Sequence, residues 1–449
     1  MPPVAWASEL RGAVIHVGAH FAEEASDYQR LTLPVLWIEG CPAFARRLGH
    51  ALDGYENQEF RIAALSESAG DVRTFHISNN AEGVSSSLKE FGQDAARLWP
   101  ELGLRHVGAV PIVTKTLDQL MSEEAAWVAI YQPKALVLDV QGSELEVLQG
   151  AIGSLWRFDT IIIEVSSANV YESGDTEGSV DSCLVSHGFI RKDYIAQVEG
   201  HGDALYVRNE SSKHDTDFES QNYTEINVAR WNHIDRSDLI HSGMSVLELG
   251  SGPGWFTQKL LDKGCLVTSV DGRPENIRAT NDQLTVEQRR LWIGYTYDAN
   301  KDVCPPGLKY DCVFAYGLLY HVSDPGCFLQ LIREVQPAIL ILETCVTPDS
   351  LTQPDALNMV DEPSTVGSQS TTGLGCRPSR LFIWNKLAEL FPCVYSFAQT
   401  VPHNQFPVDW TLSSMEEYSD YTRMIYVSSL EPLANRCLVP NLVLQHCSS

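Results

Sequence analysis

Short apolar stretches alternate with longer amphipathic or polar stretches along most of the chain. A run of about four to eight apolar residues is typical of a buried strand, whereas apolar positions spaced three or four apart indicate a helix. Their alternation predicts β-α-β units and parallel sheets. The expected strands form two series, which are 13–17, 35–38, 60–65, 135–140, 160–165 and 204–207, then 245–249, 266–270, 291–295, 310–316, 338–343, 393–397 and 423–427.

Both series begin with the same order of strand, turn, helix and strand. A glycine follows the first strand in each (Gly18 and Gly250), and an acidic residue ends the second (Glu39 and Asp271). In both series the acid stands 21 positions after the glycine. This interval is typical of a nucleoside-binding crevice at the carboxyl ends of parallel strands. We therefore expect two tandem Rossmann-like α/β domains, each a mostly parallel sheet flanked by helices.

A polar segment without periodicity, residues 209–215, separates the two series. It places the domains at residues 1–210 and 222–449. Within the second domain, residues 347–377 contain few apolar residues and many Pro, Gly, Ser and Thr, which predicts a long loop or lid. The residues that follow this loop are expected to form an extension on the substrate side.

Composition narrows the class of protein. The chain has 449 residues, of which 44% are hydrophobic and 20% charged, as in ordinary globular proteins. Its 32 basic and 58 acidic residues give a net charge of −26, and both halves are acidic, which disfavours a nucleic-acid partner. No apolar run approaches the ~18 residues of a membrane span, no signal peptide is evident, and the 11 cysteines contain no C-x-x-C pair. We expect a cytoplasmic protein with reduced thiols and no membrane contact; its oligomeric state is not predicted.

The second glycine turn departs from the dinucleotide-binding pattern G-x-G-x-x-G, because Trp255 stands at the third glycine. Glu248, Gly250, Gly252 and Gly254 instead form the pattern E-x-G-x-G-x-G. This pattern resembles the first motif of class I S-adenosylmethionine-dependent methyltransferases. The resemblance implies that the four residues lie in the cofactor site and that the turn approaches the methionyl part of S-adenosylmethionine.

Later segments extend this resemblance. It implies that Asp271 binds the ribose hydroxyls and that Asp298 faces the adenine amino group. Residues 317–321 (Gly-Leu-Leu-Tyr-His) resemble a segment of small-molecule and wobble-uridine methyltransferases of this class. His321 is therefore a candidate general base, or a hydrogen-bond partner that orients the nucleophile. A structural histidine at a strand end is the alternative.

The first half lacks the later glycines, because His20 and Ala22 occupy their positions. Eight other segments nevertheless carry a resemblance to the FkbM family of methyltransferases over residues 12–208. These segments are Ile15–His20, Trp37–Glu39, Ala64–Ser66, Ser85–Leu88, Thr116–Asp118, Leu138–Leu145, Glu164–Val165 and Gly202–Val207. The commoner FkbM form has Glu at the position of Gln141 and Asn at that of His20, so this chain removes one formal charge from the pocket.

The FkbM resemblance implies a cofactor site with Gly18 in the turn, Glu39 on the ribose and Asp139 at the end of the fourth strand. It places Glu144 on the substrate side, together with Gln141 and Glu164. For the catalytic base it leaves Glu144 and His20 open.

Metal ligation is the second open question in the first half. Asp139 and Glu164 could hold a divalent cation through oxygen ligands. We interpret these two residues as hydrogen-bonded carboxylates that hold no metal, so no metal site is predicted. His16, His20, Glu23 and Glu24 lack the spacing of the zinc motif H-E-x-x-H.

The combined resemblances predict a bifunctional S-adenosylmethionine-dependent methyltransferase that O-methylates small polar acceptors such as sugars, glycans or natural-product hydroxyls. Arg377, Arg380, Trp384 and residues 403–410 are candidates for the acceptor pocket of the second half, with a structural cap as the alternative. Two other functions stay open. One is a single catalytic domain beside a degenerate binding domain, and the other is an RNA nucleoside methyltransferase, which the acidic charge disfavours.

Overall fold

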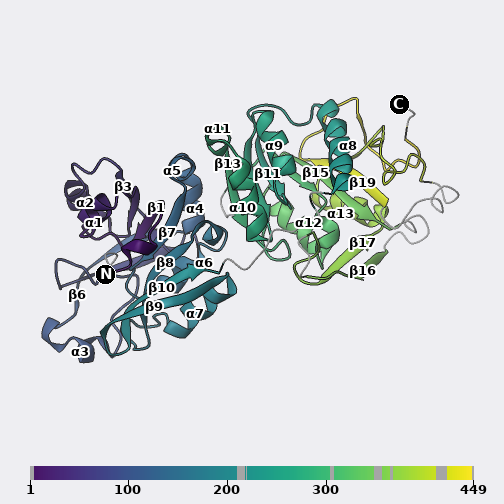
Figure 1. Ribbon diagram of the computed structural model, residues 1–449. Coiled ribbons are helices and arrows are strands. Elements are labelled where there is room, and N and C mark those ends of the chain that lie inside the picture. Colours follow the sequence, from purple (N-terminus) through teal and green to yellow (C-terminus); the bar gives the residue numbers. More distant parts are fainter. Residues whose placement is uncertain are drawn as a thin grey trace. The chain divides into compact units, whose positions relative to one another are not determined.

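The computed structural model describes residues 5–209, 218, 220–303, 308–347, 356–364, 368–410 and 422–446. The chain divides into two compact units, Met1–Ser212 and Lys213–Ser449. Each unit is an α/β domain built around one large, mostly parallel sheet (Figure 1). The predicted fold class is thereby confirmed.

The first domain contains a seven-stranded sheet in the order β3-β2-β1-β7-β8-β10-β9. β10 runs antiparallel to both of its neighbours, and the other pairs are parallel. A second, three-stranded sheet has the order β4-β6-β5. The strands are β1 (Ala13–Val17), β2 (Val35–Glu39), β3 (Gln58–Ile62), β4 (Ala64–Leu65), β5 (Val72–Ser78), β6 (His106–Lys115), β7 (Pro133–Leu138), β8 (Thr160–Ser166), β9 (Phe189–Val198) and β10 (His201–Arg208).

Helices cover both faces of the seven-stranded sheet. Ala13, Ile15 and Val17 of β1 pack in one core with side chains of α4 to α7, whereas Val14 packs in another with side chains of α1 and α2. A strand that is buried on both faces reads as a continuous apolar run, which is why β1 was predictable. The helices are α1 (Ala25–Arg30), α2 (Ala45–Ala51), α3 (Ala95–Leu98), α4 (Leu117–Glu123), α5 (Ala125–Tyr131), α6 (Glu144–Gln149) and α7 (Glu177–Ser186).

The second domain contains an eight-stranded sheet in the order β13-β12-β11-β14-β15-β19-β18-β20, and β16 and β17 form a separate antiparallel hairpin. Its strands are β11 (Ser245–Leu249), β12 (Leu266–Asp271), β13 (Trp292–Thr296), β14 (Cys312–Tyr316), β15 (Ile339–Val346), β16 (Leu357–Asp361), β17 (Leu374–Pro378), β18 (Cys393–Phe397), β19 (Thr422–Ser429) and β20 (Leu438–Val439). Its helices are α8 (Gln221–Ser237), α9 (Trp255–Asp262), α10 (Pro274–Gln283), α11 (Val286–Arg289), α12 (Pro325–Glu334) and α13 (Arg380–Leu390).

The two large sheets share one topology. When the strands of each sheet are numbered along the chain, both follow the order 3-2-1-4-5-7-6, and β20 adds an eighth strand to the second sheet. The order reverses beside the first strand, between β1 and β7 in one domain and between β11 and β14 in the other. Ligands of open α/β sheets bind at this switch point, outside the carboxyl ends of the strands.

Several elements differ from the predicted ones. The predicted strand 60–65 divides into β3 and β4, which belong to different sheets, and β5, β6, β9, β16, β17 and β20 were not predicted. β5, β6 and β9 mix exposed and buried positions, so no continuous apolar run marks them. The predicted loop over 347–377 is also different: its described residues, 356–364 and 368–377, include the β16–β17 hairpin.

Among the described residues, no helix combines the length and the apolarity that crossing a bilayer requires.

Candidate active sites

The turn after β1 passes very close to the end of β7. Gly18 has a φ of +91°, and a Cβ atom at this position would lie 1.7 Å from the carbonyl oxygen of Asp139. Only glycine fits such an approach. The two residues in place of the later glycines also have positive φ values, +41° at His20 and +55° at Ala22.

The turn after β11 has the same backbone form. Gly250, Gly252 and Gly254 have φ values of +72°, +52° and +87°. A Cβ atom at Gly250 would lie 2.9 Å from Cβ of Leu318. Three left-handed residues therefore stand at equivalent positions in both domains, although only one of the three is glycine in the first.

Glu39 closes the first turn from the end of β2. Its Oε2 accepts a hydrogen bond from the backbone N–H of His20 at 2.8 Å, and its Oε1 accepts one from the N–H of Cys41 at 2.7 Å. Burial raises the pKa of Glu39 to about 7, although these two bonds act in the opposite direction. The carboxylate thus stays fixed on the turn.

Asp271 closes the second turn in the same way. Its Oδ2 accepts a hydrogen bond from the N–H of Gly252 at 2.8 Å, and its Oδ1 accepts one from the N–H of Arg273 at 2.9 Å. Burial again raises the pKa of this carboxyl. In both domains the acid binds the amide two residues after the first glycine and the amide two residues after itself.

Two cavities border the carboxyl end of the first sheet. One, of about 50 Å³, is lined by Gly18, His20, Glu39 and Asp139 among others. The other, of about 180 Å³, has a different wall, which includes Gly142, Glu144, Glu164, Tyr171 and His201. The segment 139–144 borders both cavities. This arrangement provides one compartment beside the turn and a separate one beside Glu144 and Glu164.

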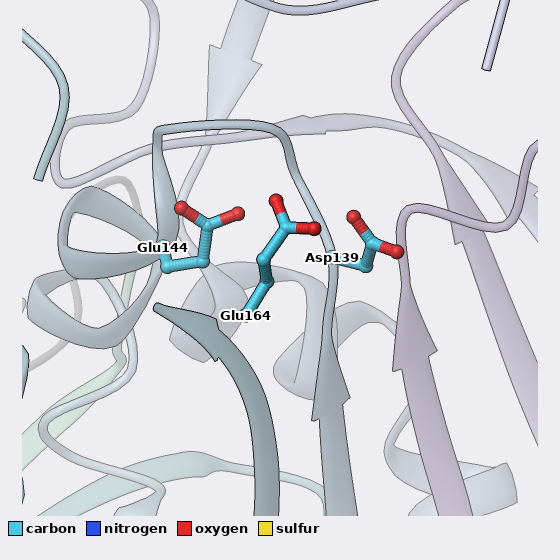
Figure 2. Close-up of side chains that lie close together, drawn as sticks. All are labelled: Asp139, Glu144 and Glu164. Atoms are coloured by element: carbon cyan, nitrogen blue, oxygen red, sulfur yellow. The ribbon is translucent and has the colours of Figure 1, made fainter. Parts of the chain in front are cut away.

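Three carboxylates meet between these cavities. Asp139, Glu144 and Glu164 come from the end of β7, from α6 and from β8, and one oxygen of each lies within 4.8 Å of the others (Figure 2). Oxygen ligands at this spacing could hold a divalent cation. Each carboxylate also has a protein donor: Glu144 accepts the N–H groups of Val140 and Gly142. Asp139 and Glu164 both accept hydrogen bonds from the side-chain amide of Gln141. The absence of a metal stays a prediction.

Two residues that the sequence did not single out complete this cluster. His201 Nε2 lies 3.2 Å from Glu164 Oε1, and the hydroxyl of Tyr171 donates to Gln141 Oε1 at 2.5 Å. Burial, and then the nearby charge of Asp139, raises the pKa of Glu164, while burial lowers the pKa of His201. His201 reaches Glu164 because β10 pairs with β8, and that pairing leaves no local signal in the sequence.

The two candidate bases of the first domain lie on different cavities. His20 lines the cavity beside the turn, with Nδ1 2.6 Å from Glu23 Oε1. Glu144 lines the other cavity, and its carboxylate is held by backbone amides. Burial and then the charge of Glu164 raise the pKa of Glu144 well above its ordinary value.

In the described part of the second domain, a large cavity of about 640 Å³ extends from Gly250, Gly252 and Asp271 to His321. Glu248 is not among the described residues that line it. Its Oε2 accepts hydrogen bonds from Thr257 at 2.5 Å and Ser269 at 2.8 Å, and burial raises its pKa to about 7. The structure therefore places Glu248 inside the core, where it ties β11 to α9 and β12.

Two other predicted cofactor residues also lie off the described lining. Gly254 is the N-cap of α9, and a Cβ atom there would lie 2.7 Å from the side chain of Thr280. Asp298 accepts hydrogen bonds from the backbone and side-chain nitrogens of Asn300, at 3.1 and 2.9 Å. Asn300 itself lines the cavity, so Asp298 shapes the turn that presents it. A contact between Asp298 and adenine stays a prediction.

His321 forms a buried pair with a residue from the hairpin. Its Nδ1 lies 2.5 Å from Glu362 Oε2, and Arg377 Nη2 lies 3.3 Å from Glu362 Oε1. Burial acts to raise the pKa of Glu362, but the hydrogen bond with His321, the charges of His321 and Arg377 and the N–H of Ser370 together lower the pKa overall. A carboxylate accepts a hydrogen bond from a protonated Nδ1, so the tautomer that matches this contact keeps the lone pair on Nε2 as an acceptor. Glu362 was not predicted as a site residue, because the segment that contains the hairpin was expected to be a loop.

A second group of ion pairs, around Glu343, is more buried than the pair of His321 and Glu362. Glu343 on β15 is fully buried, and Arg230 Nη2 and Arg423 Nη1 each lie 3.1 Å from its Oε1. Arg423 also donates from Nε to Gln405 Oε1 at 2.8 Å. Both arginines line the cavity.

The predicted acceptor residues divide between cavity and core. Arg377, His403, Asn404 and Gln405 line the cavity. Arg380 instead lies in the core, where it donates to the carbonyl of Val443 at 2.7 Å and stacks on Trp410. Trp384 packs against the hydrophobic core as well.

Comparison with known protein families identifies the family of each domain. Residues 16–192 match the family described as methyltransferase FkbM domain, and residues 230–359 match one described as methyltransferase domain. The chain joins an FkbM methyltransferase domain to a second methyltransferase domain. The predicted family resemblance of each half is thereby confirmed.

Relatives match only part of the chain. The ubiquinone biosynthesis O-methyltransferase of Cereibacter sphaeroides is 29% identical over 112 residues, which cover 25% of this chain and 44% of that protein. The same enzyme of Azorhizobium caulinodans is 28% identical over 122 residues, covering 27% and 47%. The chain thus spans less than half the length of these curated relatives. Among solved structures, the N-terminal domain of EvdMO1 with S-adenosylhomocysteine and D-fucose has a TM-score of 0.35 at 18% identity, covering 47% of this chain and 83% of that one.

S-adenosylmethionine is the cofactor of this class of domain. The residues of both domains fit it. In the FkbM domain and in the C-terminal domain alike, a buried carboxylate lines a cavity beside a turn that only glycine can begin. A carboxylate in this position is suited to accept hydrogen bonds from a ribose diol.

Proposed function

We propose that the chain is a bifunctional S-adenosylmethionine-dependent O-methyltransferase, in which each domain binds its own cofactor and methylates a hydroxyl group of a small polar acceptor such as a sugar, a glycan or a natural product. One observation carries the proposal: Glu39 and Asp271 make the same pair of backbone hydrogen bonds on the same left-handed turn. The repeated geometry speaks against a degenerate first domain.

In the C-terminal domain the proposed base is His321. When bound, S-adenosylmethionine supplies a methyl group on a sulfonium. Gly250, Gly252 and Asp271 would hold the cofactor, whose methyl group would pass to the acceptor oxygen with loss of its bond to sulfur, and His321 Nε2 would take the hydroxyl proton. Glu362 keeps the ring oriented from Nδ1. The products are a methyl ether, S-adenosylhomocysteine and a proton that His321 releases to water.

In the FkbM domain the pair of Glu164 and His201 is the better proton acceptor. Both line the cavity on the acceptor side, and they lie 3.2 Å apart. Glu144 has its carboxylate committed to the amides of Val140 and Gly142. His20 lines the other cavity, so its role is on the cofactor side.

The oxygen acceptor is supported by the relatives, whose names describe O-methyltransferases. The acidic composition favours small molecules over nucleic acid as the acceptor.

The test is product analysis by mass spectrometry with methyl-labelled S-adenosylmethionine and a panel of hydroxylated metabolites. The wild-type chain, Glu39→Gln, Asp271→Asn and the double variant are compared. We expect each single variant to lose one set of products and the double variant to lose all of them. Label transfer that survives in the double variant would overturn the proposal.

A further inference from the structure

The cavity of the C-terminal domain extends well beyond the cofactor end. Asp271 ends β12 and Arg423 lies on β19, and β11, β14 and β15 lie between these strands in the sheet. At about 4.8 Å per strand, roughly 19 Å separates the two backbones. Both residues line the same cavity. It can therefore hold a nucleoside at one end and an acceptor at the other.

Arginine side chains form the wall of the far end. Arg230 comes from α8, Arg377 from β17 and Arg423 from β19, and all three line the cavity. Their partners, Glu343 and Glu362, are not among the described residues of that lining. The two carboxylates thus lie behind the three guanidinium groups, and one positive charge is left over.

The guanidinium groups are held in place before any ligand arrives. Arg377 and Arg423 stack on Tyr320, with Cζ at 5.1 and 5.0 Å from its ring centroid, and Arg423 Nη2 donates to the Tyr320 hydroxyl at 3.3 Å. A fixed guanidinium presents paired N–H donors that match carboxylate and phosphate oxygens.

Neighbouring groups are consistent with a positive field. Burial, and then the charges of Arg230 and Arg423, lowers the pKa of His403, which lines the same cavity. Apart from Asp271, the described lining includes one other carboxylate, Glu225, which is exposed and accepts a hydrogen bond from Gln221 at 2.8 Å.

We propose that this arginine wall binds an oxyanion, carboxylate or phosphate, on the acceptor, so that the C-terminal domain methylates an anionic small molecule. The inference rests on the proposed function, because it assigns the acceptor of that site. His321 and Arg377 bind the two oxygens of the same Glu362 carboxylate. The reacting hydroxyl and the oxyanion therefore belong to one compact molecule.

The test uses the full chain saturated with S-adenosylhomocysteine. Benzoate, inorganic phosphate and neutral benzamide are titrated calorimetrically at constant ionic strength. We expect benzoate or phosphate to bind with a Kd on the order of millimolar and benzamide not to bind, because only the anions satisfy the guanidinium groups. The anion that binds more tightly distinguishes a carboxylate acceptor from a phosphate one.

Arg377→Gln should weaken the bound anion by about tenfold or more, since it removes a charged hydrogen-bond donor. Arg377→Lys keeps the charge without the planar fork and should weaken it by about threefold. Arg290→Gln, an equal charge change at an exposed site outside the described cavity lining, is the matched control and should have no effect. Should Arg377→Gln not fold, Arg377→Lys carries the test.

Equal binding of benzamide, no binding of either anion, or an unchanged affinity in both Arg377 variants would overturn the inference. Failure of the C-terminal site to bind S-adenosylhomocysteine would instead count against the proposed function. The two failures are thus distinguishable in one set of titrations.

Discussion

The two domains agree on the cofactor side and differ on the acceptor side. Glu39 and Asp271 make matching hydrogen bonds to matching turns. The cavity that we propose for the acceptor in the FkbM domain is lined by Glu144, Glu164 and Asp175, whereas the cavity of the C-terminal domain is lined by four arginines, three of which form the proposed anion site. The shared part is set by backbone conformation, and the different part by side chains from strands and loops that differ between the two domains.

The turn of the FkbM domain keeps the left-handed backbone conformation although two of its three glycine positions hold other residues. His20 and Ala22 adopt the left-handed backbone for which Gly252 and Gly254 serve in the other domain. A left-handed conformation at a non-glycine residue costs roughly 1–2 kcal/mol of conformational free energy, so the surrounding contacts have to stabilise it. The first glycine alone has no substitute, because Asp139 lies where a side chain would be.

The largest predicted effect tests that last point. Gly18→Ala should destabilise the FkbM domain by about 3 kcal/mol or more, since it adds left-handed strain to a backbone overlap. Urea unfolding of the full chain measures the change. Gly54→Ala is the matched control, because its φ is +93° but nothing lies within 4 Å, and it should cost only about 1 kcal/mol. Equal costs for the two variants would contradict the close approach.

The next effect concerns the acceptor side of the C-terminal domain. His321→Gln should lower kcat by about 100-fold or more, as expected for loss of a general base, and Glu362→Gln by about tenfold. Affinity for S-adenosylhomocysteine should not change, because neither residue contacts the turn. A normal kcat in His321→Gln would show that the histidine is structural.

The pH dependence of the FkbM site follows from Glu39, whose pKa is about 7. Ribose hydroxyls would donate to its ionised form, so cofactor affinity should fall by at most about tenfold per pH unit as the pH drops below 7. The stability of the fold depends on pH in the opposite direction. The raised pKa of Glu39 contributes its full stabilisation below the ordinary pKa of 4.5, and this contribution is lost as the pH rises through about 7. Titrations between pH 6 and 8 measure the affinity. The titrations use Asp271→Asn, in which only the FkbM site should bind, and an affinity that does not change with pH would contradict this role of Glu39.

The smallest effect sharpens the comparison of the turns. Ala22→Gly should stabilise the FkbM domain by up to about 1 kcal/mol, because relief of the left-handed strain exceeds the added freedom of the unfolded chain. Gly254→Ala should act in the opposite direction, since its Cβ atom would meet Thr280. Urea midpoints compare the two, and a destabilised Ala22→Gly would mean that the methyl group packs usefully.

Sequence patterns predicted the strands that are buried on both faces, because burial leaves apolar runs at β1, β2, β11 and β12. They also singled out Glu39 and Asp271, through the interval from glycine to acid, and binding of ribose by these two acids stays a prediction. Glu248 shows the limit of a motif, because strand geometry turns its side chain toward Thr257 and Ser269.

Other site residues had no local signal. His201 and Arg423 reach their partners only because β10 pairs with β8 and β19 with β15. Glu362 depends on a hairpin in a segment of mixed polarity. Such contacts follow from tertiary pairing, which a single sequence does not specify.

The central claim is that one chain contains two cofactor sites of the same design. Calorimetric titration of the full chain with S-adenosylhomocysteine tests it most directly. Two equivalents should bind, Glu39→Gln and Asp271→Asn should each retain one, and the double variant should bind none. A wild-type stoichiometry of one, unchanged by either substitution, would contradict the account.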